Sequence, residues 1–456
     1  MMKHVNIAVA CLLLHGCGLK NLAAPKDSLR INTPDVWKAA ENRENREISS
    51  HWLDEFHDPV MRRTVNDALS HNQNLQAAAS RLRVAKELSI QARAARLPRA
   101  NLGSSLGASV SDSDITERYG LSFAASWEPD LWGRLRNLDR AGAADFEAAV
   151  AEFRNAKLSL AALSAKSYCN LISAQQQSNL AVVTLESFQK NLRIIERNYK
   201  AGIPSVRALD VQLGRTNVSS TQRSVTARQL DRDETARNLE VLLGRYPTAT
   251  LQAAHELPEI SDSIPLGIPA TLIERRPDLA AARSRIFASS ERAKAAKKNL
   301  LPDISLSAGS GTSRSVIARL FDTQSLVTSI TASLSQVLYN GGANVSEVRA
   351  ALARNDAAIH DYAQLSLEAF REVESALATE SSLAVQVAFL NKEVEQAALA
   401  EKQAERDYSE GIEGVDILSV LESQRRANNA RSALIRLKNE RLQARIDLHV
   451  ALGGSF

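Results

Sequence analysis

The chain has 456 residues, of which 24% are charged and 5% aromatic, with 56 basic against 52 acidic side chains. This length allows about two to four ordinary domains, and the many Ala, Leu, Glu and Arg residues are typical of long helices rather than of aromatic-rich cores. Because the formal net charge is only +4 and the charges are interspersed, the composition does not indicate a nucleic-acid partner.

The N-terminus has the pattern of an export signal. Lys3 supplies a basic start, and the apolar stretch that follows is too short to remain as a membrane-spanning helix. We predict a signal peptide over residues 1–16 and a lipid-anchored extended segment over residues 17–58. The residues up to Cys17 resemble a bacterial lipobox, so Cys17 is the predicted site of acylation, although His15 stands where a small residue is usual. An ordinary signal cleaved nearby is the alternative.

The rest of the chain reads as two copies of one unit. Residues 74–109 align with residues 278–313, and all matched pairs of positions lie about 204 to 209 residues apart. We predict a first structural repeat over residues 59–255 and a second over residues 271–454. A segment rich in Gly and Pro, residues 256–270, marks the linker between them.

Each repeat is predicted to contain a helix, two strands, a long helix, a sharp turn and a returning helix. The stretch from Gly133 to Lys200 has no Pro and one internal Gly, and the stretch from Gly342 to Glu410 has neither inside it. Apolar residues recur every seven positions in both stretches, which favours antiparallel and lateral coiled-coil packing of helices about 100 Å long. The predicted ranges are strands 98–128 and helices 133–200 and 203–245 in the first repeat, and strands 302–338 and helices 342–410 and 414–452 in the second.

The predicted strands alternate strictly between two kinds of side chain. Leu102, Leu106 and Val110 alternate with small residues such as Gly103 and Ser105. Strands of roughly 10 residues fit a tilted span of a bilayer, with the apolar face toward lipid and the small polar face toward water. A half-buried soluble sheet would alternate similarly, but the export signal favours the membrane. Because four strands cannot close and open edges are not tolerated in lipid, several chains must share one barrel.

Two of the four tryptophans lie where a predicted strand passes into a long helix. Trp127 ends the alternating pattern and Trp132 immediately precedes the helix. An amphipathic ring with one polar N–H is accommodated best at the edge of a bilayer, so both are predicted to be membrane-interface aromatics. The alternative is packing between helix and strand, which for Trp132 has equal weight.

Three motifs resemble those of a known family, the outer membrane factors of the TolC, OprM and NodT type. These are "SWEPDLWGRLRN", "IPATLIERRPDLAAARSRI" and "LVTSITASLSQVLYNGG", and the resemblance covers roughly residues 50–454. It implies an α+β membrane protein in the cell outer membrane, lipid-anchored, with a periplasmic extension. Each protomer would contribute four transmembrane β-strands to a trimeric twelve-stranded barrel, and long antiparallel α-helices would form a periplasmic tunnel.

The resemblance also places a gate at the periplasmic turns between the long and returning helices. By position, Asp210, Asp416 and Leu418 are the candidates. Three like carboxylates around a threefold axis repel each other and select cations, which suits a hydrated gate. Alternatively, Asp416 caps the returning helix, a common role for Asp.

The same turns are where this family meets its partners. The resemblance implies a homotrimer that binds a periplasmic adaptor protein, which connects it to an inner-membrane pump of the RND type. Gly202, Gly411 and Gly414 would let the backbones approach closely, so they are the candidate adaptor contacts. Lipid of the outer membrane is the remaining partner.

The implied function is a passive conduit that exports small toxic compounds, including antibiotics. A TolC-like exit duct for type I protein secretion is an alternative within the family, and a periplasmic coiled-coil scaffold without a pore is an alternative of another class. The eight His residues show no metal-ligand spacing, and no catalytic motif occurs. We therefore predict no enzymatic activity, no metal and no cofactor.

Overall fold

The structure, a computed structural model, describes most of the chain after its N-terminus. The signal peptide, Cys17, Gly411 and Gly414 lie outside the described residues. The chain divides into two compact units, which we call the strand unit (residues 80–152 and 278–365 in its described part) and the hairpin unit (residues 32–79, 153–277 and 366–456, likewise). The described residues are 36–40, 52–111, 114–203, 206–260, 269–315, 326–410, 412 and 416–454.

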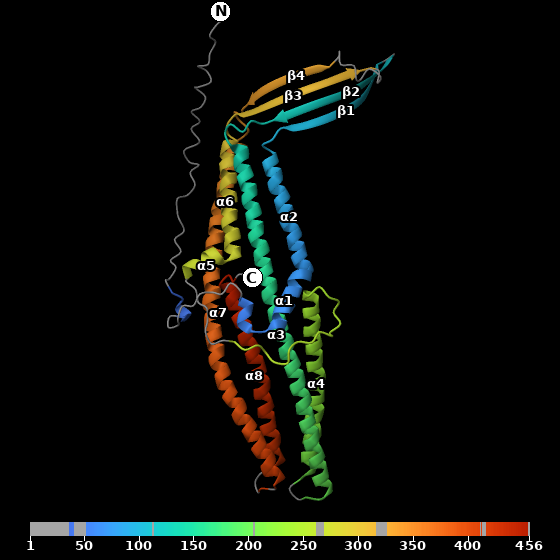
Figure 1. Ribbon diagram of the computed structural model, residues 1–456, viewed down its shortest axis with the longest axis vertical. Helices are drawn as coiled ribbons and strands as arrows, with labels where there is room; N and C mark the ends of the chain where they lie inside the picture. Colours follow the sequence, from blue (N-terminus) through green and yellow to red (C-terminus); the bar gives the residue numbers. More distant parts are fainter. Residues whose placement is uncertain are drawn as a thin grey trace, which may run out of the picture. The chain divides into compact units, whose positions relative to one another are not determined.

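The strand unit contains an antiparallel sheet in the order β1-β2-β3-β4 (Figure 1). Its register places Leu102 opposite Phe123 and Gly103 opposite Ser122, so the alternating residues of neighbouring strands join into one apolar and one small polar face. The apolar side chains are open, with Leu102 76% and Ile330 82% exposed. The strands are β1 (Arg99–Ser111), β2 (Asp114–Trp127), β3 (Asp303–Arg314) and β4 (Val327–Ser335).

Small residues let the helices of the strand unit approach closely. Ala141 and Ala144 pack against Ala288 in a cluster made only of alanines. At Gly142, an added Cβ would lie 2.8 Å from the Cβ of Ala92, so a larger residue would force these helices apart. The helical segments of this unit are most of α2 (Gln73–Ala94) and α6 (Pro277–Lys298), and the first parts of α3 (Arg134–Lys200) and α7 (Ala343–Ser409).

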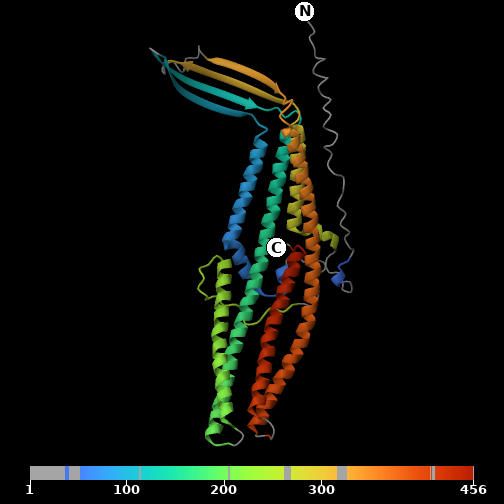
Figure 2. The ribbon, with the colours of Figure 1, turned by 180° about the vertical axis from the view of Figure 1, so that it is seen from behind.

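The hairpin unit contains two helical hairpins, in which α4 (Ala208–Leu242) returns along α3 and α8 (Ile417–Ala451) returns along α7 (Figures 1 and 2). The long helices α3 and α7 have 67 residues each, and the returning helices α4 and α8 have 35 residues each. Each position in the first hairpin therefore corresponds to the position 209 residues later in the second, because α3 begins at Arg134 and α7 at Ala343. None of the described helices has a stretch both apolar and long enough to cross a bilayer.

The helix expected before each pair of strands is two helices in the structure. α1 (Pro59–His71) ends at Asn72, whose side chain accepts a hydrogen bond from the Leu75 N–H and donates one to the Leu242 carbonyl. The chain therefore turns there before α2 begins. α5 (Pro269–Arg275) ends just before Pro277, whose ring lacks an N–H and starts α6 anew.

The main core of the hairpin unit is assembled from distant segments. Two short 3₁₀ helices from the N-terminal part of the chain belong to this unit, η3 (Lys38–Ala40) and η4 (Trp52–Phe56). Trp52 and Phe56 are 0% and 2% exposed and pack with residues of α1, α3, α4 and α8. Leu171 of α3 and Ala236 of α4 belong to the same cluster.

Candidate functional site

The two tryptophans at the strand-to-helix junction are tied to backbone carbonyls. The Trp127 Nε1–H donates to the Arg96 carbonyl at 2.9 Å, and the Trp132 Nε1–H donates to the Pro302 carbonyl at 2.7 Å. Both rings remain open, with Trp127 40% and Trp132 45% exposed. Trp132 thus joins the start of α3 to the segment that leads into β3, while part of each ring stays available to its surroundings. Their role at a membrane interface stays a prediction.

The turn after α3 requires glycine. Gly202 has a φ of +71°, and the Ile203 N–H closes the turn by donating to the Asn198 carbonyl at 3.1 Å. Among the described residues, nothing lies within 4 Å of the position that a Cβ of Gly202 would take. After α7, the Ile412 N–H makes the corresponding bond to the Asp407 carbonyl at 3.0 Å.

Asp416 caps α8. It immediately precedes the helix, and its carboxylate accepts hydrogen bonds from the Ser419 N–H at 2.9 Å and the Ser419 hydroxyl at 2.8 Å. These bonds from Ser419 hold the pKa of the Asp416 carboxyl below its ordinary value. The Asp416 side chain is exposed, so it caps α8 and also faces solvent.

Asp210 does not occupy the position corresponding to Asp416. It is the third residue of α4, only 1% exposed, and its Oδ2 accepts a hydrogen bond from the Arg207 N–H at 2.8 Å. Its Oδ1 has no hydrogen-bond partner among the described residues. Around it pack apolar residues of both hairpins, including Val206, Val211 and Ile417. The sequence placed Asp210 and Asp416 at equivalent returns, but one carboxylate is buried and the other open.

Leu418 lies in a groove between α3, α4 and α8. The side chain is 39% exposed, and the groove has a volume of about 630 Å³. Three arginines line it, Arg223 and Arg228 from α4 and Arg425 from α8. Arg425 is paired with Glu422, which also lines the groove, so the groove combines these charged groups with an apolar strip.

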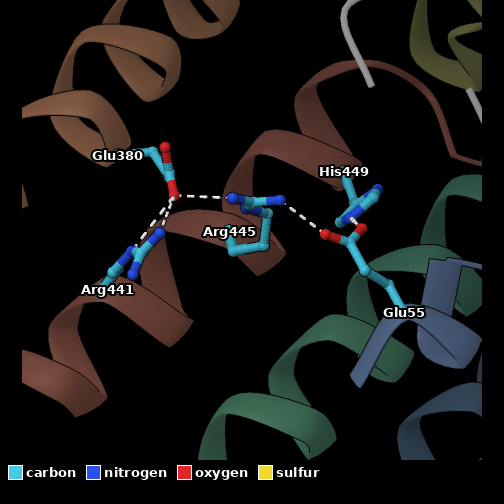
Figure 3. A network of polar contacts seen from close by, with 5 residues as sticks. All are labelled: Glu55, Glu380, Arg441, Arg445 and His449. Carbon is cyan, nitrogen blue, oxygen red and sulfur yellow. Dashed lines mark hydrogen bonds and ion pairs between the residues drawn. The ribbon is translucent and has the colours of Figure 1, made fainter. Parts of the chain in front are cut away.

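Figure 3 shows a network of charged side chains that sequence reasoning missed. Arg445 of α8 is 0% exposed and contacts two carboxylates, Glu55 Oε1 at 2.6 Å and Glu380 Oε1 at 2.7 Å. Arg441 also reaches Glu380, at 3.2 Å, and His449 Nε2 lies 2.6 Å from Glu55 Oε2. The network joins η4, α7 and α8 inside the hairpin unit.

The neighbouring groups of this network stabilise the ionised form of the Glu55 carboxyl. Burial alone would raise the pKa of the Glu55 carboxyl, but the hydrogen bond and charge of His449, with Arg445 beside them, hold that pKa below its ordinary value. The only sequence signal was the placement of Arg445 and His449 four residues apart on the apolar side of a helix, which suggests a common buried partner. The described residues contain no group of three or more His, Cys, Asp or Glu placed to hold a metal ion.

Antiparallel strands with one small polar face, long paired helices and open glycine turns are features of an outer membrane channel subunit. The chain matches the model of the outer membrane efflux protein family over residues 64–245 and 268–454. The protein belongs to this family, whose members are channels rather than enzymes.

Individual relatives agree with this assignment. The chain is 30% identical over 474 aligned positions to the pyoverdine export outer membrane protein OpmQ of Pseudomonas aeruginosa, covering 100% of this chain and 97% of the relative. It is also 30% identical to the toluene efflux pump outer membrane protein TtgF of Pseudomonas putida, covering 99% and 97%. Among solved structures, the outer-membrane channel OprN superposes with a TM-score of 0.84 at 27% identity, covering 95% of this chain and 99% of that one. The chain is thus the outer membrane component of an efflux system.

Proposed function

We propose that three copies of this chain form one exit duct, which a periplasmic adaptor connects to an inner-membrane pump of the RND type. The sheets of three chains would make a barrel of twelve strands in the outer membrane, and the helices would make the periplasmic tunnel. Acylation of Cys17 would add a lipid anchor. The observation that carries this proposal is the sheet with its open apolar face in a member of the efflux family.

The unpaired edges of the sheet support assembly from several chains. β1 and β4 each have one edge without a partner strand in the described part of the chain. A bilayer does not tolerate unsatisfied backbone groups, so these edges need the strands of further copies. On α7, an apolar stripe is also open in the single chain, with Val385, Phe389 and Leu399 55%, 67% and 57% exposed. Contact with another copy would cover both features.

We place the gate and the adaptor contacts at the returns between helices. Asp416 is open and ionised, and Leu418, the second residue of α8, lies in the arginine-lined groove, which supports a role for both in the closed tip. Asp210 would act from inside the packing, where it holds the start of α4. Gly202 supports close approach of a partner, and Gly411 and Gly414 are proposed for the same role from the sequence.

Small molecules are the proposed cargo. The relatives named for export of pyoverdine and of toluene support small-molecule efflux over secretion of proteins. The proposal also includes the two halves of the chain as copies of one unit, which the equal lengths of α3 and α7 and of α4 and α8 support.

Three experiments test this function. Deletion in the native host, followed by a screen of toxic compounds and of secreted proteins, should sensitise the cells to small molecules and leave the secreted proteins unchanged; the opposite result would favour protein secretion. Outer-membrane fractions should contain trimers whose electrophoretic mobility changes on heating, and a soluble monomer would contradict the channel.

Asp416→Ala with Asp210→Ala should raise conductance in planar bilayers, and unchanged conductance would remove both from the gate.

A further inference from the structure

We propose that η3 and η4 together form a latch, the N-terminal latch, whose charged contacts hold α8 against α7 and thereby control the mobility of the second hairpin. Its docking is argued from contacts inside the hairpin unit. Its consequence for opening of the channel deepens the proposed function and rests on it.

The polar half of the latch is Glu55. Its two carboxylate oxygens contact Arg445 and His449, both of which are 0% exposed. Arg445 also forms an ion pair with Glu380 of α7. If η4 withdrew, a guanidinium and an imidazole in the core would lose the partner that compensates their burial. The position of α8 against α7 therefore depends on a residue that belongs to neither helix.

The apolar half of the latch consists of Trp52 and Phe56, whose rings contact His449. The Trp52 ring stacks on the His449 ring, with centroids 5.8 Å apart and 24° between planes. Phe56 meets His449 edge-on at 6.4 Å. His449 is thus held by two aromatic rings and one carboxylate from a single 3₁₀ turn, which orients its Nε2 toward Glu55.

A second attachment is made to α7 at Glu374, which precedes Glu380 in the helix. The N–H groups of Lys38 and Ala39 in η3 donate to the two oxygens of Glu374, at 2.9 and 2.8 Å. Trp37, 3% exposed, packs on Phe370 with ring centroids 6.1 Å apart. The latch therefore contacts α7 through η3 and α8 through η4, and the contacts of Lys38, Ala39 and Glu55 with these helices can separate without unwinding either helix.

The first hairpin meets η4 through the apolar cluster, whereas the ion pairs of Glu55 are made with Arg445 and His449 of the second. At the positions that correspond to Arg445 and Glu380 it has Ala236 and Leu171, which pack without charge. The position that corresponds to His449 is Glu240, which binds the N–H groups of residues 249–251, the segment that directly follows α4. One hairpin is thus closed by its own continuation, whereas the other is closed by a segment 390 residues away in the chain. Loss of the Glu55 charge, which leaves the apolar contacts of η4 with α3 and α4 in place, should therefore loosen the second hairpin and not the first.

Hydrogen–deuterium exchange of the full-length protein in lipid nanodiscs tests the latch. Glu55→Gln keeps the shape of the side chain but removes its charge, so exchange in α7 and α8 after residue 380 should rise about tenfold or more. Exchange in α3 after residue 153 and in α4 should stay unchanged. The matched control is Asp54→Asn, the neighbour in η4, whose ion pair with Arg62 is open to solvent and should leave both hairpins as they are.

Two results would overturn the latch: equal loosening of both hairpins, which indicates a general loss of stability, or exchange in Glu55→Gln no faster than in Asp54→Asn. If Glu55→Gln does not fold, Glu374→Gln replaces it, because it weakens only the η3 attachment. A smaller rise confined to α7 and α8 supports the latch, and no rise contradicts it.

Conductance in planar bilayers separates the latch from the proposed function. If the second hairpin forms part of the gate, Glu55→Gln should open more often than Asp54→Asn. A wild-type protein that forms no channel would contradict the proposed function, while the exchange comparison would still decide the latch.

Discussion

The two helical hairpins have the same dimensions but are closed by different chemistry. In the first, an apolar cluster that includes Leu171 and Ala236 fills the space between helices. In the second, the corresponding Glu380 and Arg445 form a buried ion pair that needs Glu55 from the N-terminal latch. Both hairpins share the apolar cluster that contains Trp52 and Phe56, so the exchange of a few side chains changes only whether a hairpin also needs a charge from a distant segment.

The starts of the returning helices repeat this difference on a smaller scale. α8 is capped by the Asp416 side chain, which binds the Ser419 N–H. In α4 the roles are exchanged, because the Asp210 side chain at the position of Ser419 binds the N–H of Arg207 at the position of Asp416. Both arrangements satisfy one free N–H at a helix start, but only one leaves a carboxylate on the surface.

The largest effect is expected from Arg445→Ala. This change removes the cation that the half-buried Glu55 and the buried Glu380 share and leaves only His449 and Arg441 beside them, so the protein should lose about 4 kcal/mol of stability. Arg436→Ala, at an exposed site of the same helix, is the control and should cost under about 0.5 kcal/mol. The measurement is thermal loss of helical circular dichroism in detergent. Equal midpoints for the two variants would show that the ion pair does not close the second hairpin.

Leu171→Ala tests the apolar closure of the first hairpin. Leu171 is 0% exposed, so its truncation should cost about 3 kcal/mol through lost transfer energy and a cavity. Leu163→Ala, in the same helix at a site 50% exposed, should cost far less. The same thermal measurement applies. If Leu171→Ala were also to loosen α7 and α8 in hydrogen exchange, the two hairpins would not be closed separately.

Glu240→Gln weakens the local closure of the first hairpin. An amide cannot supply two acceptor oxygens to the three N–H donors of residues 249–251, so about 2 kcal/mol should be lost. Limited trypsin digestion should cut faster after Arg245, which lies between α4 and this segment. Glu234→Gln, exposed in the same helix, provides the reference rate. A cleavage rate equal to the reference would argue that the carboxylate does not hold the segment.

The two helix starts make a smaller, paired test. Asp416→Ala removes a capping side chain and should cost about 1 kcal/mol at the start of α8. Arg207→Ala should cost little, because the donor that Asp210 binds is the backbone N–H of residue 207, which alanine retains. Exchange rates of the first turns of α8 and α4 report each effect. A larger effect from Arg207→Ala would reverse the assigned roles.

The smallest effect concerns pH. Burial would raise the pKa of Glu240, but hydrogen bonds from the backbone of residues 249–251 outweigh it and hold the pKa below its ordinary value of 4.5. A lowered carboxyl pKa stabilises the folded protein above the ordinary value, and this contribution is lost as pH falls through the lowered one. The difference in melting temperature between wild type and Glu240→Gln should stay constant from pH 7 to 5 and shrink below pH 4.5. A difference that already shrinks at pH 6 would contradict this assignment.

Much of the helical architecture was accessible to sequence reasoning. Long stretches without Pro predicted helices over 133–200 and 342–410, and the structure has Arg134–Lys200 and Ala343–Ser409. A largely helical chain with a small sheet was predicted and is confirmed. The break at Asn72 was missed because Asn at a helix interior and Asn as a cap look alike until the partner carbonyl of Leu242 is known.

The site was less accessible because its contacts connect remote parts of the chain. The pairing of Glu55 with Arg445 has no local signature, since charges spaced hundreds of residues apart show no periodicity. The sequence predicts equivalent roles for Asp210 and Asp416 because both follow a Tyr-x-x-Gly turn, whereas burial depends on the neighbouring hairpin. Capping by Asp416 was foreseen as an alternative, because local hydrogen bonds do follow from spacing.

The contact between η4 and α8 also constrains the order of folding. Trp52 and Phe56 are synthesised near the beginning of the chain, but their partners in α8, such as Ile446, come almost at its end. Contacts between residues so far apart form late, since a long loop must close first. The part of these aromatic residues that α8 covers therefore stays exposed until the final helix is present, and a chain truncated before α8 would retain this apolar surface as an aggregation-prone site.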